Sequence, residues 1–432
     1  MRRTRVICQI SETVRKLRTR CLITTLLMML AAPAVAQEAL LGSWTGKLNI
    51  MGLQQLTLVL HLQQAEGEVK ATLDSPDQSV RGIAATTDYL SDDSVAVRVP
   101  MLGASLRARL GGGRLEGTFT QRGMSFPIAL DKGEETVRRP QTPAPPYPYV
   151  TKEVSFSNMA DSATLAGTLT YPQGFDTMTA GSVPVVLMVS GSGQQNRDEE
   201  LFDHKPFLVI ADYLARHGIA SLRYDDRATG ASTGGDVRNA TTQHFMRDAS
   251  AGISFLRRQK GFGPVGCLGH SEGGTIAFML GARGEADFIV ALAAPGVKGD
   301  TLLAAQVNSI MQQSGMVPTM TAALYRQQRA VKQSPWLQWF TDYDPSADIS
   351  HTRCPVFALN GDRDRQVTAP LNPDAIRCLL PPTEHNQVKT YAGLNHLFQH
   401  CTTGLPAEYR QTEETIAPEV LSDVAGWINA LP

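Results

Sequence analysis

The chain has little of what marks several protein classes. Only 6% of its 432 residues are aromatic, its formal net charge is −1, and it contains six cysteines. A near-neutral chain without a basic patch is not typical of nucleic-acid-binding proteins, and the cysteine spacing matches no zinc site. With 42% hydrophobic and 19% charged residues, the composition is that of an ordinary globular protein of two or three domains.

No apolar run reaches the roughly 20 residues that a membrane-spanning helix needs. Residues 2–20 instead carry seven Arg and Lys, residues 21–30 are mainly apolar, and Ala34-Val35-Ala36 follows. This order predicts a signal peptide over residues 1–36 and, after its cleavage, a secreted or periplasmic bacterial protein without a membrane span. In an oxidising compartment, Cys378 and Cys401 are candidates for a disulfide.

The rest of the chain contains two regions with different sequence patterns, joined by a linker. Residues 37–135 contain short alternating or apolar runs separated by turn signals such as Gly111-Gly112-Gly113, which predicts a small all-β barrel or sandwich domain. Residues 136–150 include a proline-rich stretch that we interpret as a semi-rigid linker. In residues 151–432 strand-like and helical segments alternate, which favours an α/β domain with a doubly wound, mostly parallel sheet. Helical sequence over about 298–350 interrupts the alternation and predicts a cap insertion.

Gly269-His270-Ser271-Glu272-Gly273 matches the pattern G-x-S-x-G. A buried-strand pattern precedes it and a helical pattern follows it, as in a nucleophile elbow, where a strand-to-helix turn exposes a serine hydroxyl. A second match surrounds Ser232, but residues 235–239 after it have loop composition. We therefore predict that Ser271 is the nucleophile and Ser232 is a loop residue.

A serine nucleophile needs a histidine base and an acid that orients it, and behind a nucleophile elbow the acid precedes the histidine along the chain. We predict that His396, after the expected last strand, is the base, with His400 as the fallback. His385 precedes that strand and is expected on the surface. After the strand that ends near Leu359, Asp362 and Asp364 both qualify as the acid, and Asp364 is preferred because it lies further into the turn.

The oxyanion formed by such a nucleophile needs two backbone N–H donors. One is expected from Glu272, the residue after the nucleophile. The other is expected from the glycine-containing loop 190–198, where we choose Ser192.

Three segments carry a resemblance to a known family. Residues 190–198, SGSGQQNRD, resemble an H-G-S-G-P-x-D-R-D loop, residues 224–232, YDDRATGAS, resemble Y-D-x-R-G-x-G-x-S, and residues 395–399 resemble the histidine loop. The region 150–432 thus resembles α/β-hydrolases, in particular EstD-type carboxylesterases and serine aminopeptidase-like hydrolases. Ser190, Asn196 and Ala228 depart from the usual His, Asp and Gly. The resemblance implies hydrolysis of short acyl esters without metal or cofactor.

The preferred hypothesis is a serine carboxylesterase that acts on a small acyl ester through Ser271, His396 and Asp364. A peptidase of the same fold is the nearest alternative, and it would need acidic groups that bind a substrate amine. A thioesterase is disfavoured because coenzyme A thioesters are scarce outside the cytoplasm. In a hypothesis of another class, the hydrolase part is vestigial and the β domain binds an envelope component. The sequence does not indicate the oligomeric state.

Overall fold

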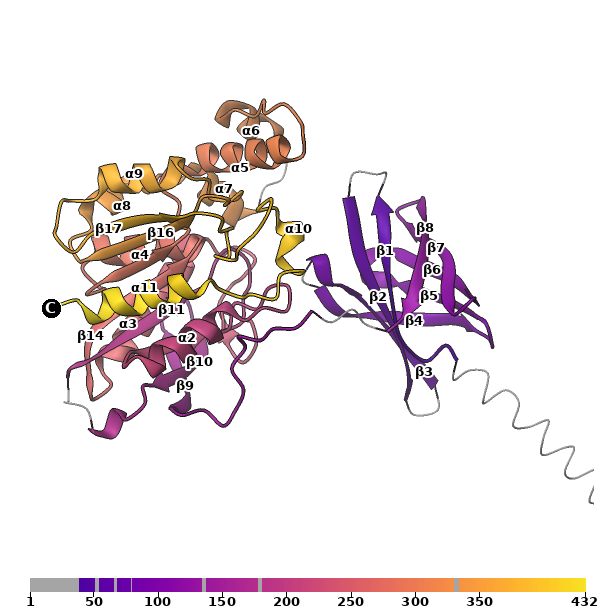
Figure 1. Ribbon diagram of the computed structural model, residues 1–432, viewed down its shortest axis with the longest axis horizontal. Helices are drawn as coiled ribbons and strands as arrows, with labels where there is room; N and C mark the ends of the chain where they lie inside the picture. Colours follow the sequence, from indigo (N-terminus) through magenta and orange to yellow (C-terminus); the bar gives the residue numbers. More distant parts are fainter. Residues whose placement is uncertain are drawn as a thin grey trace, which may run out of the picture. The chain divides into compact units, whose positions relative to one another are not determined.

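The computed structural model describes residues 39–432 apart from 51–53, 66–67, 79, 134–136, 178–180 and 330–333. The predicted signal peptide, residues 1–36, lies outside the described residues. The chain divides into two compact units, of which the first ends at Thr136 and the second comprises Val137–Pro432 (Figure 1). None of the helices in the described part is long and apolar enough to cross a membrane.

The first unit is a closed antiparallel barrel in which each strand pairs with the next and β8 pairs back with β1. Alternate side chains point inward, and Trp44, Leu60, Leu73 and Leu130 are at most 1% exposed in its core. The predicted all-β unit is therefore a barrel and not a sandwich. Its strands are β1 (Gly42–Ile50), β2 (Gln54–Ala65), β3 (Glu68–Ser75), β4 (Val80–Leu90), β5 (Ser94–Val99), β6 (Ala104–Gly111), β7 (Arg114–Gln121) and β8 (Met124–Lys132).

The second unit contains a nine-stranded mixed sheet. Its order is β13-β10-β12-β11-β14-β15-β16-β17, with β9 paired to β10. The strands from β12 to β17 along this order are parallel, and the β9–β10 hairpin is joined antiparallel to β12. The strands are β9 (Val150–Asn158), β10 (Ala163–Tyr171), β11 (Val183–Val189), β12 (Ala220–Tyr224), β13 (Thr233–Gly234), β14 (Phe262–His270), β15 (Ile289–Leu292), β16 (Val356–Gly361) and β17 (Gln387–Tyr391).

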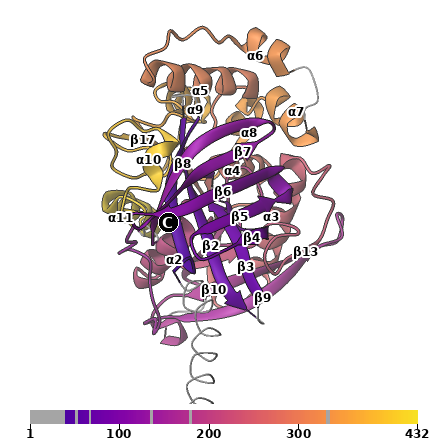
Figure 2. The same cartoon turned by 90° about the vertical axis from the view of Figure 1, so that its right-hand side faces the viewer.

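Helices cover both faces of this sheet, as predicted for a doubly wound α/β fold (Figures 1 and 2). One apolar core contains residues of α3 (Thr242–Arg257), α4 (Glu272–Ala282) and α9 (Leu371–Leu379). The other contains residues of α2 (Pro206–Arg216) and α11 (Pro418–Asn429). Buried strands such as β11, with sequence VPVVLMV, supply apolar side chains to both cores, as parallel strands covered on two sides must.

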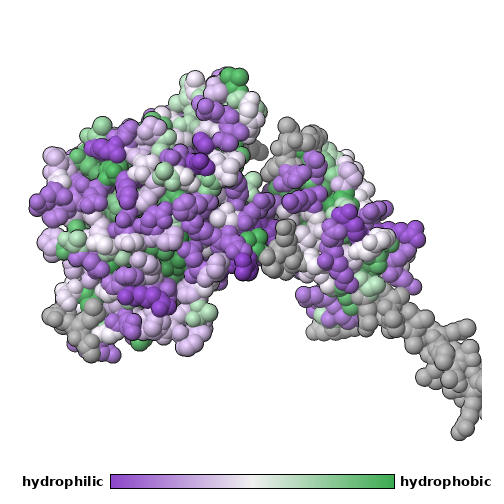
Figure 3. Space-filling model, in the orientation of Figure 1, coloured by the Kyte–Doolittle hydropathy of each residue, from purple (hydrophilic) through white to green (hydrophobic). Residues whose placement is uncertain are grey.

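A helical insertion separates β15 from β16. It comprises α5 (Gly299–Gln313), α6 (Ala322–Arg329), α7 (Pro335–Asp342) and α8 (Ser346–His351). We call the segment α5–α7 the cap, which Figure 1 shows at one side of the sheet. Hydrophilic residues predominate on the visible face of the second unit, and apolar residues gather at the outer end of the cap (Figure 3). A short helix, α10 (Pro406–Tyr409), follows the last strand.

Candidate active site

Ser271 occupies a sharp turn between β14 and α4. Its backbone has φ +54° and ψ −115°, a strained conformation for a residue other than glycine. The two glycines of the motif allow this turn, because a Cβ on Gly269 would lie 1.9 Å from the Gly273 carbonyl oxygen, and one on Gly273 would lie 2.0 Å from that of Val189. The Ser271 N–H donates to the Leu292 carbonyl over 2.8 Å. The local geometry is that of a nucleophile elbow.

Asp364 and His396 lie on the loops after β16 and β17, at neighbouring strand ends. His396 Nδ1 lies 2.7 Å from Asp364 Oδ2, and both side chains are nearly inaccessible to solvent. The other carboxylate oxygen of Asp364 accepts the N–H groups of Gln366 and Val367 at 2.7 and 2.8 Å. Asp364 is thus fixed by the backbone and can fix the ring orientation of His396.

The alternative base and acid lie elsewhere. His400 is paired with the Glu414 carboxylate at 2.8 Å, and its side chain is 56% exposed. His385 lies on the loop before β17 and also has a partly exposed side chain. Asp362 accepts the Gly393 N–H over 2.7 Å, so it supports the histidine loop from outside the Asp364–His396 contact.

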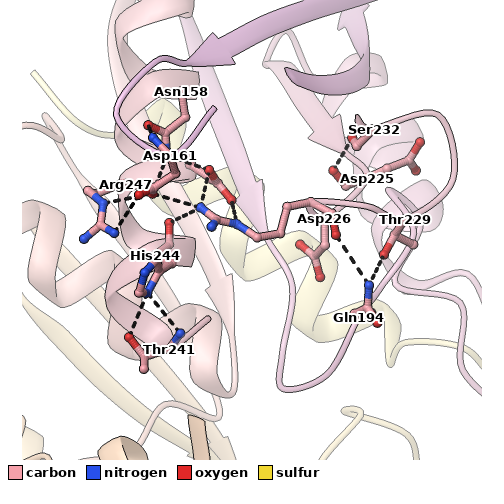
Figure 4. Close-up of polar contacts among 12 residues, drawn as sticks. Asn158, Asp161, Gln194, Asp225, Asp226, Thr229, Ser232, Thr241, His244 and Arg247 are labelled. Carbon is pink, nitrogen blue, oxygen red and sulfur yellow. Dashed lines mark hydrogen bonds and ion pairs between the residues drawn. The ribbon is translucent and has the colours of Figure 1, made fainter. Parts of the chain in front are cut away.

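The hydroxyl of Ser232 has two partners within the protein. It donates to the carbonyl oxygen of Asp225 over 2.7 Å and accepts the Ala166 N–H over 2.8 Å. Figure 4 shows Ser232 beside Asp225 in this loop. The second G-x-S-x-G match thus joins the loop after β12 to β10.

The predicted oxyanion donors belong to two segments that border the Ser271 pocket or turn, α4 and the loop 190–198. Glu272 is the first residue of α4, so its N–H has no acceptor within the helix. In the opposite loop, a Cβ on Gly191 would lie 3.3 Å from the Ser271 Cβ. The Gly191 N–H itself donates to a carboxylate oxygen of Glu199 over 2.7 Å. Ser192 follows Gly191 in the chain and provides the next N–H of this loop. It lines the same pocket as Ser271.

A buried acid, Asp226, supports the loop 190–198, which we call the oxyanion loop because it contains the predicted donor Ser192. Its carboxyl group accepts the Gln195 N–H at 2.9 Å and the Ser190 hydroxyl at 3.3 Å. Burial raises the pKa of Asp226 to about 8, against the effect of these two hydrogen bonds. Ser190, which replaces the usual histidine of the related loops, therefore still contributes a side-chain contact that fixes the loop.

The loop after β12 is anchored by the buried Arg227. Its guanidinium donates to Asp248 at 2.7 and 2.8 Å, to Asp161 at 3.1 Å and to the His244 carbonyl at 2.9 Å. Figure 4 shows this network, in which Asn158 also takes part, between the β9–β10 hairpin and α3. Charged groups so deeply buried need partners of opposite sign, and the network accounts for the arginine of the Y-D-x-R-like segment 224–227 as structural support.

Ser271 and His396 line a pocket of about 420 Å³. Its walls include Leu302 and Phe340 from the cap and Val367 from the loop that follows β16 and carries Asp364, which we call the acid loop. These three side chains form one apolar cluster. Among the residues that the structure describes, Glu199 is the only Asp, Glu, Lys or Arg that lines this pocket. The pocket suits an uncharged, largely apolar group beside the serine hydroxyl.

Two contacts of this site cannot be recognised from sequence patterns. The Glu272 side chain, which the sequence assigns only a backbone role, is 2% exposed and accepts the Thr242 hydroxyl at 2.6 Å and the Trp336 indole N–H at 2.8 Å. Glu199 binds His270, the residue before the nucleophile, at 2.9 Å. The position of His270 inside the motif places it next to Ser271, but its partner Glu199 follows only from the tertiary structure.

No group of three or more His, Cys, Asp or Glu side chains is placed to hold a metal ion in the described part of the chain. Cys378 and Cys401 are both free thiols, with Cys378 exposed.

Comparisons with known proteins agree with this architecture. Residues 205–400 match the family model described as serine aminopeptidase, S33. Esterase EstD of Thermotoga maritima is 25% identical over 277 residues, which cover 61% of this chain and 65% of that protein, just under two thirds of its length. These matches confirm the resemblance to EstD-type and serine aminopeptidase-like α/β-hydrolases.

Solved structures with a similar chain include the esterase Pf2001 of Pyrococcus furiosus, with a TM-score of 0.44 and 17% identity over 69% of this chain and 98% of that one. Est1E from Butyrivibrio proteoclasticus has a TM-score of 0.39 and 13% identity over 64% of this chain and 97% of its own.

Proposed function

We propose that this member of the α/β-hydrolase superfamily is a serine carboxylic ester hydrolase that acts on short-chain acyl esters. The observation that carries the proposal is the 2.7 Å contact between His396 and Asp364 beside the pocket that contains Ser271 on its strained turn. A nucleophile, a base and an acid that orients the base are the groups that acyl transfer through a serine requires.

The hydrogen-bond pattern supports a direction for proton transfer. Because Asp364 accepts the Nδ1–H of His396, the neutral ring has its lone pair on Nε2, which serves as the base. In the proposed reaction Ser271 attacks the acyl carbonyl while His396 takes its proton. The N–H groups of Glu272 and Ser192 stabilise the oxyanion. His396 then protonates the leaving alcohol, and a water activated by the same ring releases the acid.

The charge of the pocket favours an ester over a peptide substrate. A serine aminopeptidase must bind the α-ammonium group of its substrate, for which an acidic side chain is the natural partner. Glu199 is the one acidic side chain among the described residues of the pocket lining, and its carboxylate already binds His270 and the Gly191 N–H. Because the matching family model is described as serine aminopeptidase, S33, a peptidase is the second candidate function.

The size of the pocket supports a small acyl group. A volume of about 420 Å³ lies near the lower end of the roughly 300–1,000 Å³ of small-molecule sites. We place the mature enzyme in the periplasm or outside the cell because of the signal-peptide pattern in residues 1–36.

The test compares the wild-type enzyme with Ser271→Ala and, as a matched control, Ser232→Ala. The substrates are p-nitrophenyl esters of increasing acyl length and aminoacyl p-nitroanilides, and a fluorophosphonate probe reports the reactive serine. We expect Ser271→Ala to lose labelling and at least about 10³-fold in kcat, and Ser232→Ala to keep labelling. Labelling of Ser271→Ala would overturn the nucleophile assignment, and faster turnover of the anilides would favour the peptidase.

A further inference from the structure

A second acid–histidine pair lies beside the first one. Glu199 is 1% exposed and His270 is 5% exposed. Nδ1 of His270 lies 2.9 Å from Oε1 of Glu199, and the rings of His270 and His396 have centroids 4.8 Å apart. Neither member of this pair has a part in the acyl-transfer steps described above.

The pair connects three segments that are distant in the sequence. Glu199 Oε1 also accepts the N–H of Gly191 in the oxyanion loop, over 2.7 Å. Nε2 of His270, in the nucleophile elbow, lies 3.0 Å from the carbonyl oxygen of His396 in the histidine loop. One chain of hydrogen bonds thus runs from Gly191 through Glu199 and His270 to His396.

Hydrogen-bond chemistry fixes the number of protons in this chain. The carbonyl oxygen of His396 can only accept, so Nε2 of His270 must donate to it. The contact between Nδ1 and Glu199 then requires a second proton, because a lone pair on Nδ1 would face a carboxylate oxygen. The pair therefore consists of an imidazolium and a carboxylate, or of their equivalent with the proton on Glu199.

The backbone around Glu199 is held in an unusual conformation. Glu199, Phe202 and Asp203 have φ values of +50°, +53° and +67°, in the left-handed region that residues other than glycine rarely adopt. Such conformations persist where surrounding contacts enforce them. The segment that supplies Glu199 therefore has a strained backbone. In this conformation the Glu199 carboxylate accepts the N–H of Gly191 in the oxyanion loop.

We propose that Glu199 and His270 act together as positioning residues, because the proton between them holds the oxyanion loop at Gly191 and the histidine loop at His396 in register with Ser271. Loss of the pair leaves the chemical groups in place but lets the oxyanion donors and the base move relative to each other. Displacements of about 1 Å at such groups can cost on the order of 10²-fold in rate. This inference rests on the proposed function, since it concerns the same site.

The pair also gives a pH signature. Burial by itself lowers the pKa of His270, but the charge of Glu199 and the hydrogen bonds to Glu199 and His396 raise that pKa on balance. Three titratable groups face His270. They are Glu199 from the segment before α2, Asp364 from the acid loop and His396 from the histidine loop. Alkaline deprotonation removes the shared proton, so the wild-type kcat falls on the alkaline side through this step.

The experiment compares Glu199→Gln, His270→Gln and the double variant with the wild type, using a short p-nitrophenyl ester from pH 5 to pH 10. We expect each single variant to lose about 10- to 100-fold in kcat with KM changed less than about 3-fold. The double variant should lose no more than the worse single variant, because the two residues act as one unit. In His270→Gln the alkaline fall should disappear while the acid side of the profile remains.

A matched control uses the exposed pair of His400 and Glu414, which has the same chemistry at 2.8 Å outside the pocket lining. Glu414→Gln should keep kcat and the whole pH profile. Thermal unfolding of each variant separates misfolding from loss of positioning, and Glu199→Gln, which keeps the side-chain shape, suffices if His270→Gln does not fold.

The outcomes separate this inference from the proposed function. Wild-type kcat in a folded Glu199→Gln variant, additive losses in the double variant, or an unchanged alkaline limb in His270→Gln would each overturn the positioning role while Ser271→Ala stays inactive. An active Ser271→Ala variant would instead overturn the proposed function itself.

Discussion

The indole Nε1–H of Trp336 in the cap donates to the carboxylate of Glu272, the residue directly after Ser271, over 2.8 Å. The same carboxylate accepts the hydroxyl of Thr242 at the start of α3 over 2.6 Å. Burial raises the pKa of Glu272, and the hydrogen bonds from Thr242 and Trp336 oppose the rise. The Glu272 side chain thus links the cap helix α7, which lines the pocket, to the turn that carries Ser271.

Trp336→Phe should therefore alter both rate and acyl selectivity. The variant keeps an aromatic ring but leaves the buried carboxylate of Glu272 with one donor fewer, at a cost of about 1–3 kcal/mol. Since α7 also supplies Leu337 and Phe340 to the pocket, we expect kcat/KM for the best ester to fall about 5- to 50-fold and longer acyl chains to be discriminated less. Trp339→Phe on the same helix is the control, because Trp339 stacks on Tyr343 and is not among the described residues that line the pocket; an equal effect of both changes would contradict the role of the indole N–H.

Asp364→Asn should separate the two candidate acids. Asparagine keeps the shape of the side chain but can present an N–H to His396 Nδ1, which favours the wrong tautomer, and a comparable change costs about 10⁴-fold in a serine protease. We expect a loss of at least about 10³-fold in kcat for Asp364→Asn. Asp362→Asn can still accept the Gly393 N–H, so its loss should stay below about 10-fold. The reverse order in steady-state kinetics would move the acid to Asp362.

Asp226→Asn should change how stability depends on pH. The folded-state pKa of Asp226 is raised to about 8, whereas an unfolded aspartate titrates near about 3.9. The folded state therefore binds more protons between these values, and its free energy of unfolding falls as pH rises through that window. An asparagine side chain does not titrate, so the variant should match the wild type at about pH 4, where the unfolded aspartate is still largely protonated, and exceed it at pH 8 and above. Urea unfolding at both pH values measures this difference, and a variant that is less stable than the wild type at pH 8 would contradict it.

Arg227→Met should destabilise the second unit. The change leaves the buried carboxylate of Asp248 without the guanidinium that binds both of its oxygens, and breaking a buried ion pair typically costs about 3–5 kcal/mol. Arg257→Met removes an exposed pair with Asp287 and should cost less than about 1 kcal/mol. Equal midpoints in urea unfolding of the two variants would show that the network of Figure 4 is not needed for stability.

Much of the fold follows from patterns that are local in the sequence. The strand before Ser271 and the helix after it both lie where the alternation of apolar segments predicts them, and so does the helical insertion before β16. Chain order and the strand pattern predict Ser271, Asp364 and His396 as a set, and the structure brings His396 and Asp364 into contact. The closure of the first unit could not be predicted, because it depends on the pairing of Thr45 with Asp131, which are remote in the chain.

The supporting carboxylates are harder to anticipate for a physical reason. In a sequence, Glu199 and Asp226 look like ordinary loop acids, which are exposed in most proteins. Their burial depends on donors from other segments, namely His270 for Glu199 and Gln195 for Asp226. Such partners are specified only when the tertiary structure forms.

The closed barrel of the first unit is filled by its own side chains, Trp44 among them. Its outer wall has a hollow of about 630 Å³, and charged side chains line it, among them Lys47, Arg114, Glu116 and Asp131. The opposite face of the same strands carries the core. Exchange of these outward residues leaves the packed interior unchanged. Substitutions at outward-facing positions usually change the folding free energy by less than about 0.5 kcal/mol, so the barrel can gain or lose charged groups on this wall without disturbing its core.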